Sequence, residues 1–340
     1  MSTQARPAPA GTSTPGASTS GTSGTSAAGA AQGGDGLAAE MGAWAYSGGS
    51  IVPFGEANVS IATHALNYGT GVFEGIRAYR QDDGGTAILL ALEHYQRLLR
   101  NARLIRAQVQ ESAEELLEVT RELLRRNAHD SDVYIRPLLF KASPTIRLQL
   151  TGLEDRIAIF SFPMGGYVRT EGLRVAMSAW QRINDNAIPA RGKVTGGYVN
   201  ACLAVEDAHA AGYDEAIMLT ADGHVSEASS ANLFLVRDSV IATPPLTDDV
   251  LGGITRGAII SLARDSGYTV VERKLDRTEL YVADELFFTG TGVQIASVAS
   301  IDDRPVGDGA SYPVTADLQR RYFDAVRGRD PRYASWLTRV

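Results

Sequence analysis

The chain has 340 residues, 44% of them hydrophobic and 21% charged, which is the composition of a globular protein long enough for two domains. Its formal net charge of −7 and its pI near 5.3 argue against nucleic acid or an anionic membrane surface as the main partner. The single cysteine, Cys202, excludes an internal disulfide. The sequence has no H-E-x-x-H motif and no Cys/His zinc spacing, so we expect no metal site.

Residues 1–40 consist almost entirely of Ser, Thr, Gly, Ala and Pro. This composition buries too little apolar surface to offset the entropy of ordering, so we predict a disordered low-complexity tail. The segment lacks the apolar core of a secretory signal, and no later run is long enough to span a membrane. We therefore expect a cytoplasmic protein.

Residues 41–165 have the pattern of a small α+β domain. Tyr95, Leu98 and Ala102 recur at helical spacing, and Ser112 followed by Glu115 has the spacing of a capping box. The predicted elements are strands around a short helical turn within 59–80, a strand at 87–90, helices at 92–106 and 112–127, and strands at 133–141 and 156–164.

Gly165 and Gly166 interrupt the last of these strands, so we predict an interdomain loop at 166–172. Beyond it, many short strands with few helices predict a larger domain, 173–340, with a barrel-like sheet flanked by helices. The predicted strands are 173–178, 215–219, 225–228, 232–237, 269–273, 285–289 and 294–301, and the predicted helices are 198–211, 254–265 and 314–326.

One lysine stands in a glycine-rich loop, Ile188-Pro189-Ala190-Arg191-Gly192-Lys193-Val194-Thr195-Gly196-Gly197-Tyr198. Of the 32 basic side chains only Lys141, Lys193 and Lys274 are lysines, and all the others are arginines. Arginine carries charge but cannot form a Schiff base with an aldehyde, so Lys193 is a candidate for amine chemistry. The alternative is an exposed lysine in a flexible loop.

Two turns have the composition of phosphate-binding sites. Leu251-Gly252-Gly253-Ile254-Thr255 leads into a predicted helix, whose first N–H groups are free to bind an anion. Phe288-Thr289-Gly290-Thr291-Gly292 ends a predicted strand with similar residues. Two such turns indicate one phosphorylated ligand held from two sides, although neither contains a Walker or G-x-G-x-x-G pattern. A plain capped helix is the alternative for the first turn.

Two other patterns place polar side chains on strands. Glu227 lies among small residues at the end of the strand predicted at 225–228, where it can accept a hydrogen bond from a protonated ring nitrogen. Tyr134 and Arg136 alternate along a predicted strand, so they face the same side and suit a carboxylate substrate. The alternatives are a solvated loop carboxylate and an ordinary strand with a solvent-directed arginine.

Together these segments resemble the fold-type IV pyridoxal-phosphate enzymes, and most closely the branched-chain amino-acid aminotransferases. The matching segments are His64 to Arg77, Tyr134 to Pro137, Lys193 to Tyr198, Ser226 to Phe234, Gly253 to Arg256 and Thr289 to Gly292. They extend over nearly all of the chain from about Trp44 onward, in the family's order. The resemblance implies the α+β, two-domain fold of that family and pyridoxal 5'-phosphate as cofactor.

Carried over position by position, the resemblance implies that Lys193 holds the cofactor covalently and then moves protons. It also implies that Glu227 faces the pyridine nitrogen and that Tyr198 faces the ring hydroxyl. The positions implied for the phosphate are Arg97, Ile254, Thr255 and Thr291, with Leu251 against the ring. The positions implied for the substrate pocket are Tyr68, Phe73, Tyr134, Arg136 and Tyr167, with Thr291 and Gly292 near the substrate carboxylate.

The chain departs from the family pattern at two of the pocket positions. Met164 stands where family members often have tryptophan, and Gly292 stands where they often have alanine. Smaller walls can admit other side chains, so the substrate range and the preferred enantiomer stay open.

The resemblance implies transamination of L-leucine, L-isoleucine and L-valine with 2-oxoglutarate, giving branched 2-oxo acids and L-glutamate. It implies at least a homodimer, in which a neighbour's loop helps to close each site. Alternatives within the fold are a D-amino-acid or (R)-amine transaminase and an aminodeoxychorismate lyase; the Tyr134–Arg136 pair and Gly253-Ile254-Thr255 favour the first function. A non-catalytic protein that binds a phosphorylated ligand is the alternative from a different class.

Overall fold

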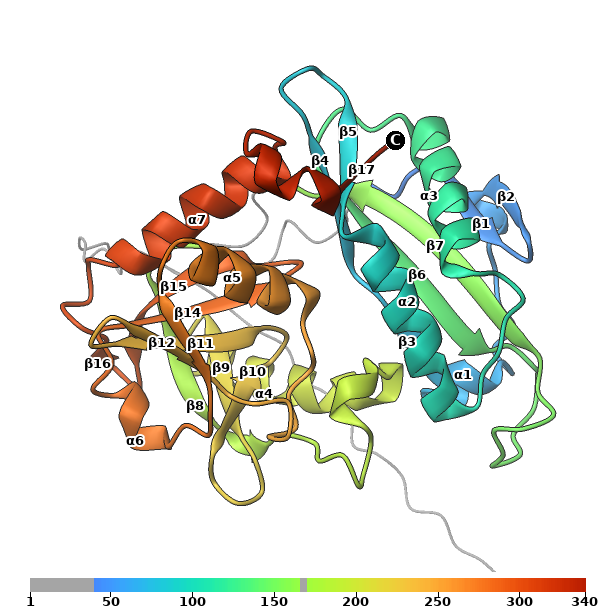
Figure 1. Ribbon diagram of the computed structural model, residues 1–340. Coiled ribbons are helices and arrows are strands. Elements are labelled where there is room, and N and C mark those ends of the chain that lie inside the picture. Colours follow the sequence, from blue (N-terminus) through green and yellow to red (C-terminus); the bar gives the residue numbers. More distant parts are fainter. Residues whose placement is uncertain (1–39, 166–169) are drawn as a thin grey trace, which may run out of the picture. The chain divides into compact units, whose positions relative to one another are not determined.

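A computed structural model describes residues 40–165 and 170–340 and arranges their strands in two sheets (Figure 1). The predicted tail, 1–40, lies outside the described residues except for Glu40, and so do residues 166–169 of the predicted interdomain loop. The α+β fold class is confirmed, whereas the boundaries of the two domains stay a prediction. No helix in the described part of the chain combines the length and the apolar character that a membrane span requires.

The first sheet is antiparallel throughout its described strands, and its longest pair joins residues 133–141 to residues 155–163. Its strands are β1 (Trp44–Ser47), β2 (Ser50–Pro53), β3 (Gly71–Phe73), β4 (Ile76–Arg80), β5 (Thr86–Leu89), β6 (Val133–Lys141), β7 (Asp155–Pro163) and β17 (Leu337–Arg339). The order is β17-β5-β4-β6-β7-β1-β2, with β3 paired to β6. The strand predicted at 133–141 is confirmed with the same bounds.

Helices α2 (Ala91–Ala102) and α3 (Ala113–Asn127) cover one face of this sheet (Figure 1). The predicted apolar stripe is confirmed, because Tyr95 and Leu98 are fully buried in the core beneath them. Ser112 is the N-cap of α3 and forms the predicted capping box with Glu115. The first helix is shorter than predicted, because residues 103–105 tighten into a 3₁₀ turn.

The second sheet is mixed, with parallel pairs β8–β9, β8–β15 and β12–β13. Its strands are β8 (Leu173–Gln181), β9 (Glu215–Leu219), β10 (Val225–Ala228), β11 (Asn232–Arg237), β12 (Val240–Thr243), β13 (Thr269–Glu272), β14 (Glu285–Gly290), β15 (Gln294–Ile301) and β16 (Arg304–Pro305). The order is β10-β9-β8-β15-β14-β11-β12-β13, with β16 paired to β15.

This second sheet must curl, because the chain runs from β10 to β11 through residues 229–231 alone. In a flat sheet five strand spacings of about 4.8 Å would separate these two strands, roughly 24 Å. The connection can reach only about 14 Å even when fully extended. The curl encloses an apolar interior that includes Leu233, Leu235 and Phe288, as the barrel-like prediction requires.

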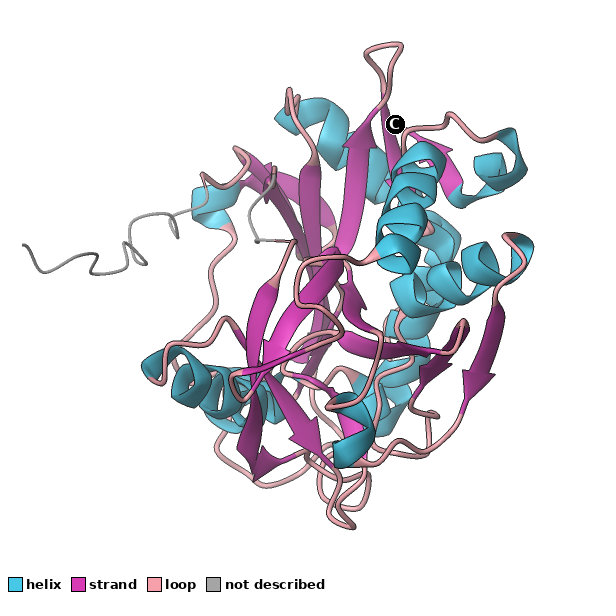
Figure 2. Cartoon of the chain, turned by 90° about the vertical axis from the view of Figure 1, so that its left-hand side faces the viewer, coloured by secondary structure: helices cyan, strands magenta, loops and turns pink. Residues whose placement is uncertain are grey.

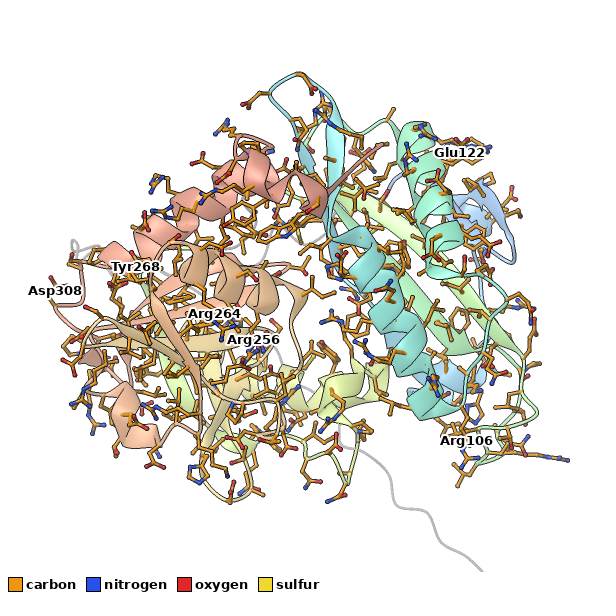
Figure 3. All side chains as sticks on the ribbon, viewed as in Figure 1. Arg106, Glu122, Arg256, Arg264, Tyr268 and Asp308 are labelled. Carbon is orange, nitrogen blue, oxygen red and sulfur yellow. The ribbon has the colours of Figure 1, made fainter. Side chains whose placement is uncertain are left out.

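The alternate residues of β11, Phe234 and Val236, face outward and pack under helices α5 (Ile254–Asp265) and α7 (Pro313–Val326). Figure 2 shows that helices lie around the outside of the strands. Arg256, labelled in Figure 3, fixes α5 to the sheet, since its Nη2 lies 2.9 Å from the Glu272 carboxylate and 3.0 Å from the Pro244 carbonyl. Helix α4 (Tyr198–Ala210) packs against β8 and β9, and α6 (Arg277–Leu280) is a single turn.

The loop that carries Lys193 is hydrogen-bonded to the first sheet. Phe73 N–H donates to the Lys193 carbonyl at 3.2 Å, and Thr195 Oγ1 donates to the Gly69 carbonyl at 2.7 Å. Gly69, at the end of helix α1 (His64–Tyr68), has φ +64°, and an added Cβ would lie 2.6 Å from Gly196 Cα. A side chain at position 69 would therefore separate the lysine loop from β3.

Candidate active site

A cavity of about 700 Å³ takes its walls from both sheets and from the lysine loop. The predicted cofactor positions that line it are Arg97, Lys193, Tyr198, Glu227, Leu251, Ile254, Thr255 and Thr291. The predicted substrate positions that line it are Phe73, Tyr134, Arg136, Thr291 and Gly292. The fold therefore brings together side chains that lie far apart in the sequence, although their individual roles stay predictions.

Two predicted site residues do not belong to this group. Tyr68 is 39% exposed and borders a separate depression with His64, and its hydroxyl donates to the Ile146 carbonyl at 2.7 Å. The short helix α1 ends at Tyr68 and directs it away from the cavity of its own chain. Tyr167 lies outside the described residues.

Lys193 has a left-handed backbone conformation, φ +46°, at the end of a 3₁₀ turn formed by Ala190–Gly192. Its Nζ donates a hydrogen bond of 2.9 Å to the hydroxyl of Tyr198, the first residue of α4. The amine also lies 4.7 Å from the centroid of the Phe73 ring. The two rings pack edge to face at 4.7 Å, so they shield one side of the amine from water.

Glu227 is buried at the inner wall, and each of its oxygens has a partner. Arg182 Nη2 lies 2.7 Å from Oε1, while Asn232 Nδ2 and the Leu251 N–H donate to Oε2 at 2.8 and 3.1 Å. Burial raises the pKa of Glu227 above its ordinary value, although the charge of Arg182 opposes this effect. The cavity thus holds a buried acid whose protonation state depends on a neighbouring arginine.

The phosphate-binding turn predicted at 251–255 is the N-terminus of helix α5. Gly253 is its N-cap residue and has no side chain to cap the helix, so within the described part of the chain the first N–H groups of α5 are available to a ligand. An added Cβ at Gly253 would lie 2.0 Å from Asn232 Oδ1, which requires glycine here. Arg97 Nη1 donates to the Gly252 carbonyl at 2.6 Å, which brings a guanidinium beside the same turn. This wall is suited to a dianion.

The opposite wall is aromatic and basic. Arg136 Nη2 donates to the Tyr134 hydroxyl at 2.9 Å, and its guanidinium lies 4.5 Å from the centroid of the Phe73 ring. Met164 and Phe162 complete this wall. Gly292 borders the cavity as well, and an added Cβ there would meet nothing within 4 Å. The space beside Gly292 is therefore open to a ligand, and Met164 borders the same cavity.

Two further residues of the site, Arg182 and Asn232, are not predicted from the sequence as site residues. Asn232 lies within a segment that carries the resemblance, but its contact with Glu227 depends on the turn after β10. Arg182 follows β8 and gives no signal, because arginine is the usual basic residue of this chain. The sheet order β10-β9-β8 brings it to Glu227, because β8 and β10 both flank β9.

Residues 71–301 match the family model for class IV amino-transferases. The chain belongs to this family. A "probable branched-chain-amino-acid aminotransferase" of Aquifex aeolicus is 44% identical to it over 300 residues, 87% of this chain and 96% of the relative. The resemblance predicted from the sequence is thereby confirmed.

Solved structures of branched-chain aminotransferases support the fold as well. The chain is similar to the branched-chain aminotransferase of Thermoproteus uzoniensis determined with norvaline, with a TM-score of 0.84, 41% identity and coverage of 87% of this chain and 98% of that one. It is also similar to the branched-chain enzyme of Thermobaculum terrenum in its PLP-bound holo-form, with a TM-score of 0.84, 35% identity and coverage of 88% and 99%.

Proposed function

We propose that this aminotransferase moves the amino group of L-leucine, L-isoleucine or L-valine to 2-oxoglutarate, with pyridoxal 5'-phosphate as cofactor. The products are the branched 2-oxo acids and L-glutamate. The observation that carries the proposal is the meeting of Lys193, Tyr198 and Glu227 in one cavity beside a phosphate-binding helix terminus. The identity with branched-chain enzymes over most of the chain supports the choice of substrate.

The residues of the cavity fit this cofactor. They offer an amine for its aldehyde, a buried carboxylate for its ring nitrogen, and the N-terminus of α5 with Arg97 for its phosphate. Thr289 Oγ1, at the cavity wall, is buried with no hydrogen-bond partner among residues 40–165 and 170–340, and it can bind a polar ligand atom. Lys193, Tyr198, Glu227, Leu251, Ile254, Thr255 and Thr291 would hold the group together with Arg97.

Pyridoxal 5'-phosphate, when bound, supplies an electron sink for the pair that remains when the substrate Cα loses its proton. Lys193 Nζ can take that proton and return it, because it is a basic group on a flexible stem within the cavity. The Tyr198 hydroxyl, 2.9 Å away, orients the amine, and the Phe73 ring keeps water from it. Glu227 holds its position through bonds to both carboxylate oxygens.

The opposite wall accounts for two kinds of substrate. Phe73, Phe162 and Met164 offer apolar surface to a branched aliphatic side chain. Arg136 offers its charge to a carboxylate of 2-oxoglutarate, and its Nε is buried without a partner in the described structure. The same wall can therefore bind the branched side chain of the amino-acid substrate and, in the other half-reaction, the carboxylate of 2-oxoglutarate.

A substrate panel tests the proposal. We expect L-leucine with 2-oxoglutarate to give L-glutamate, and D-alanine or an (R)-amine with the same acceptor to give little. Glutamate formed from D-alanine or the amine but not from L-leucine would favour the alternative transaminases, and release of pyruvate from aminodeoxychorismate would favour the lyase. Absence of visible or near-ultraviolet absorbance dependent on Lys193 in the purified protein would favour the non-catalytic binding protein.

The Arg182–Glu227 contact leads to a prediction for the pH profile. Arg182→Met removes the charge that opposes the effect of burial, so the pKa of Glu227 should rise further. If catalysis requires the ionised carboxylate, the acid limb of the kcat profile moves to higher pH. Arg174→Met, which removes an exposed arginine on β8 paired with Asp303, should leave the profile unchanged. An unshifted acid limb in Arg182→Met would contradict this role.

We also propose that the active form is a cytoplasmic homodimer or a larger homo-oligomer. Around Tyr68, apolar side chains are strongly exposed: Ile61 is 88% exposed, Leu66 63%, Ile146 75% and Leu148 87%. A second copy would cover them and allow Tyr68 to reach the neighbouring cavity. Sedimentation of the full chain measures this state directly, and a monomer at working concentration would argue against it.

A further inference from the structure

A buried carboxylate that the proposed function does not use lies directly behind Arg97. Glu74 is fully buried in the connection between β3 and β4. Arg97 Nε donates to its Oε1 at 2.7 Å and Arg97 Nη2 donates to its Oε2 at 2.7 Å, which is a bidentate pair. His94, one helical turn before Arg97 on α2, places Nδ1 2.8 Å from Oε2.

The charges in this cluster depend on burial and on the contacts among its residues. Burial opposes the ionisation of Glu74, but the charge of Arg97 and the hydrogen bonds from Arg97 and His94 lower its pKa to about 2. For His94, burial lowers the pKa, so the imidazole is neutral near neutral pH. Its Nδ1–H donates to the Glu74 carboxylate. The negative charge of Glu74 is therefore directed to the one cation in contact with it among the described residues, Arg97.

The donors of Arg97 can be counted. A guanidinium has five N–H groups. Two of them bind Glu74 and a third binds the Gly252 carbonyl. One N–H on each terminal nitrogen is left, and these two donors can bind the oxygens of a phosphate. Because Arg97 borders the cavity and binds the Gly252 carbonyl, these two donors lie beside the N-terminus of α5.

We propose that Glu74 is a positioning residue, which sets the orientation of Arg97 and thereby the affinity of the cavity for the phosphate of its ligand. The inference rests on the proposed function, since that function supplies a phosphorylated cofactor. Without a bidentate carboxylate, the Gly252 carbonyl is the one partner that Arg97 keeps among the described residues, and the guanidinium loses its fixed plane. The aldehyde and ring of the cofactor meet other residues, so Glu74 should affect the phosphate alone.

The test compares pyridoxal 5'-phosphate with pyridoxal, which lacks the phosphate. Glutamine at position 74 has the same shape, but its amide nitrogen faces an Arg97 donor and cannot accept. The full chain carrying Glu74→Gln is first freed of cofactor. We expect it to bind pyridoxal 5'-phosphate about 10- to 100-fold more weakly than the unchanged protein does. Its affinity for pyridoxal should equal that of the unchanged protein. Absorbance titration measures both affinities. An equal loss for the two ligands, or no loss for either, would overturn the inference.

Three further variants separate positioning from damage to the fold. Glu74→Asp keeps the charge but shortens the reach, so it should show the same selective loss to a smaller extent, and it serves if Glu74→Gln does not fold. Glu285→Gln alters another buried carboxylate, which binds the first N–H groups of α7 away from the cavity, and should leave both affinities unchanged. In an Arg97→Met background, Glu74→Gln should add no further loss of phosphate selectivity. A full additional loss in that background would overturn the inference.

The same titrations separate this inference from the proposed function. If the unchanged protein binds neither ligand with Lys193-dependent absorbance, the proposed function itself fails. If it binds pyridoxal 5'-phosphate more tightly than pyridoxal and Glu74→Gln preserves that ratio, only the positioning role of Glu74 fails.

Discussion

Lys193→Ala should abolish amino transfer, with kcat lowered by at least about 10²- to 10⁴-fold, the usual range for loss of a general acid–base group. The variant lacks the only amine that lines the described cavity and is hydrogen-bonded to Tyr198. It should also lose the covalent link to the cofactor and therefore the Lys193-dependent absorbance. Steady-state assays with L-leucine and an absorbance spectrum measure the two effects separately.

The lysine content of this chain provides an unusually clean control. Lys274 is half exposed and pairs with Asp222 at 2.9 Å, so Lys274→Ala should keep both activity and absorbance. Borohydride reduction followed by peptide mapping leaves only Lys141, Lys193 and Lys274 as candidates for the modified lysine. A cofactor label on Lys141 or Lys274, or full activity in Lys193→Ala, would refute the assignment.

Glu227→Gln should lower kcat by about 10²- to 10³-fold, as expected when a preorganised electrostatic contact at the reacting group is lost. Glutamine still accepts a bond from Asn232 or the Leu251 N–H, but it carries no charge for a protonated ring nitrogen. The covalent link should persist, because Lys193 is unaltered. Single-turnover rates with L-leucine therefore isolate the proton-transfer half of the reaction from cofactor attachment.

The control for Glu227→Gln is Glu285→Gln, which alters a second buried carboxylate. We expect Glu285→Gln to react at the rate of the unchanged protein, since its contacts lie at the N-terminus of α7. A rate in Glu227→Gln equal to that of the unchanged protein would show that the carboxylate is structural. If Glu227→Gln loses the cofactor but reacts at an unchanged rate when the cofactor is supplied, Glu227 has a role in cofactor binding instead.

Local patterns predicted most of the secondary structure. The strands at 133–141, 215–219, 225–228, 232–237 and 294–301 and the helix at 254–265 have the predicted bounds. Strand β12 was missed because the hairpin before it turns at Asp238 and Ser239, which have positive φ without the usual glycine. Strand β17 was missed because a three-residue strand has no measurable periodicity, and its pairing with β5 joins distant parts of the chain.

The sequence by itself determined the candidate chemistry of this protein. Lys193 is conspicuous because lysine is rare here, and the glycine-rich turns are conspicuous because glycine lets a ligand approach the backbone closely. These signals are local, so they can be recognised in the sequence without the tertiary structure.

Only the tertiary structure decided which side chains act on one another. Arg182 reaches Glu227, and Arg97 is held by Glu74, through contacts that no spacing in the sequence announces. The position of Tyr68 outside the cavity of its own chain is likewise not evident from the sequence. Hydrogen-bond partners and burial depend on how the second sheet curls and how the lysine loop joins the first, and those are properties of the whole packed chain.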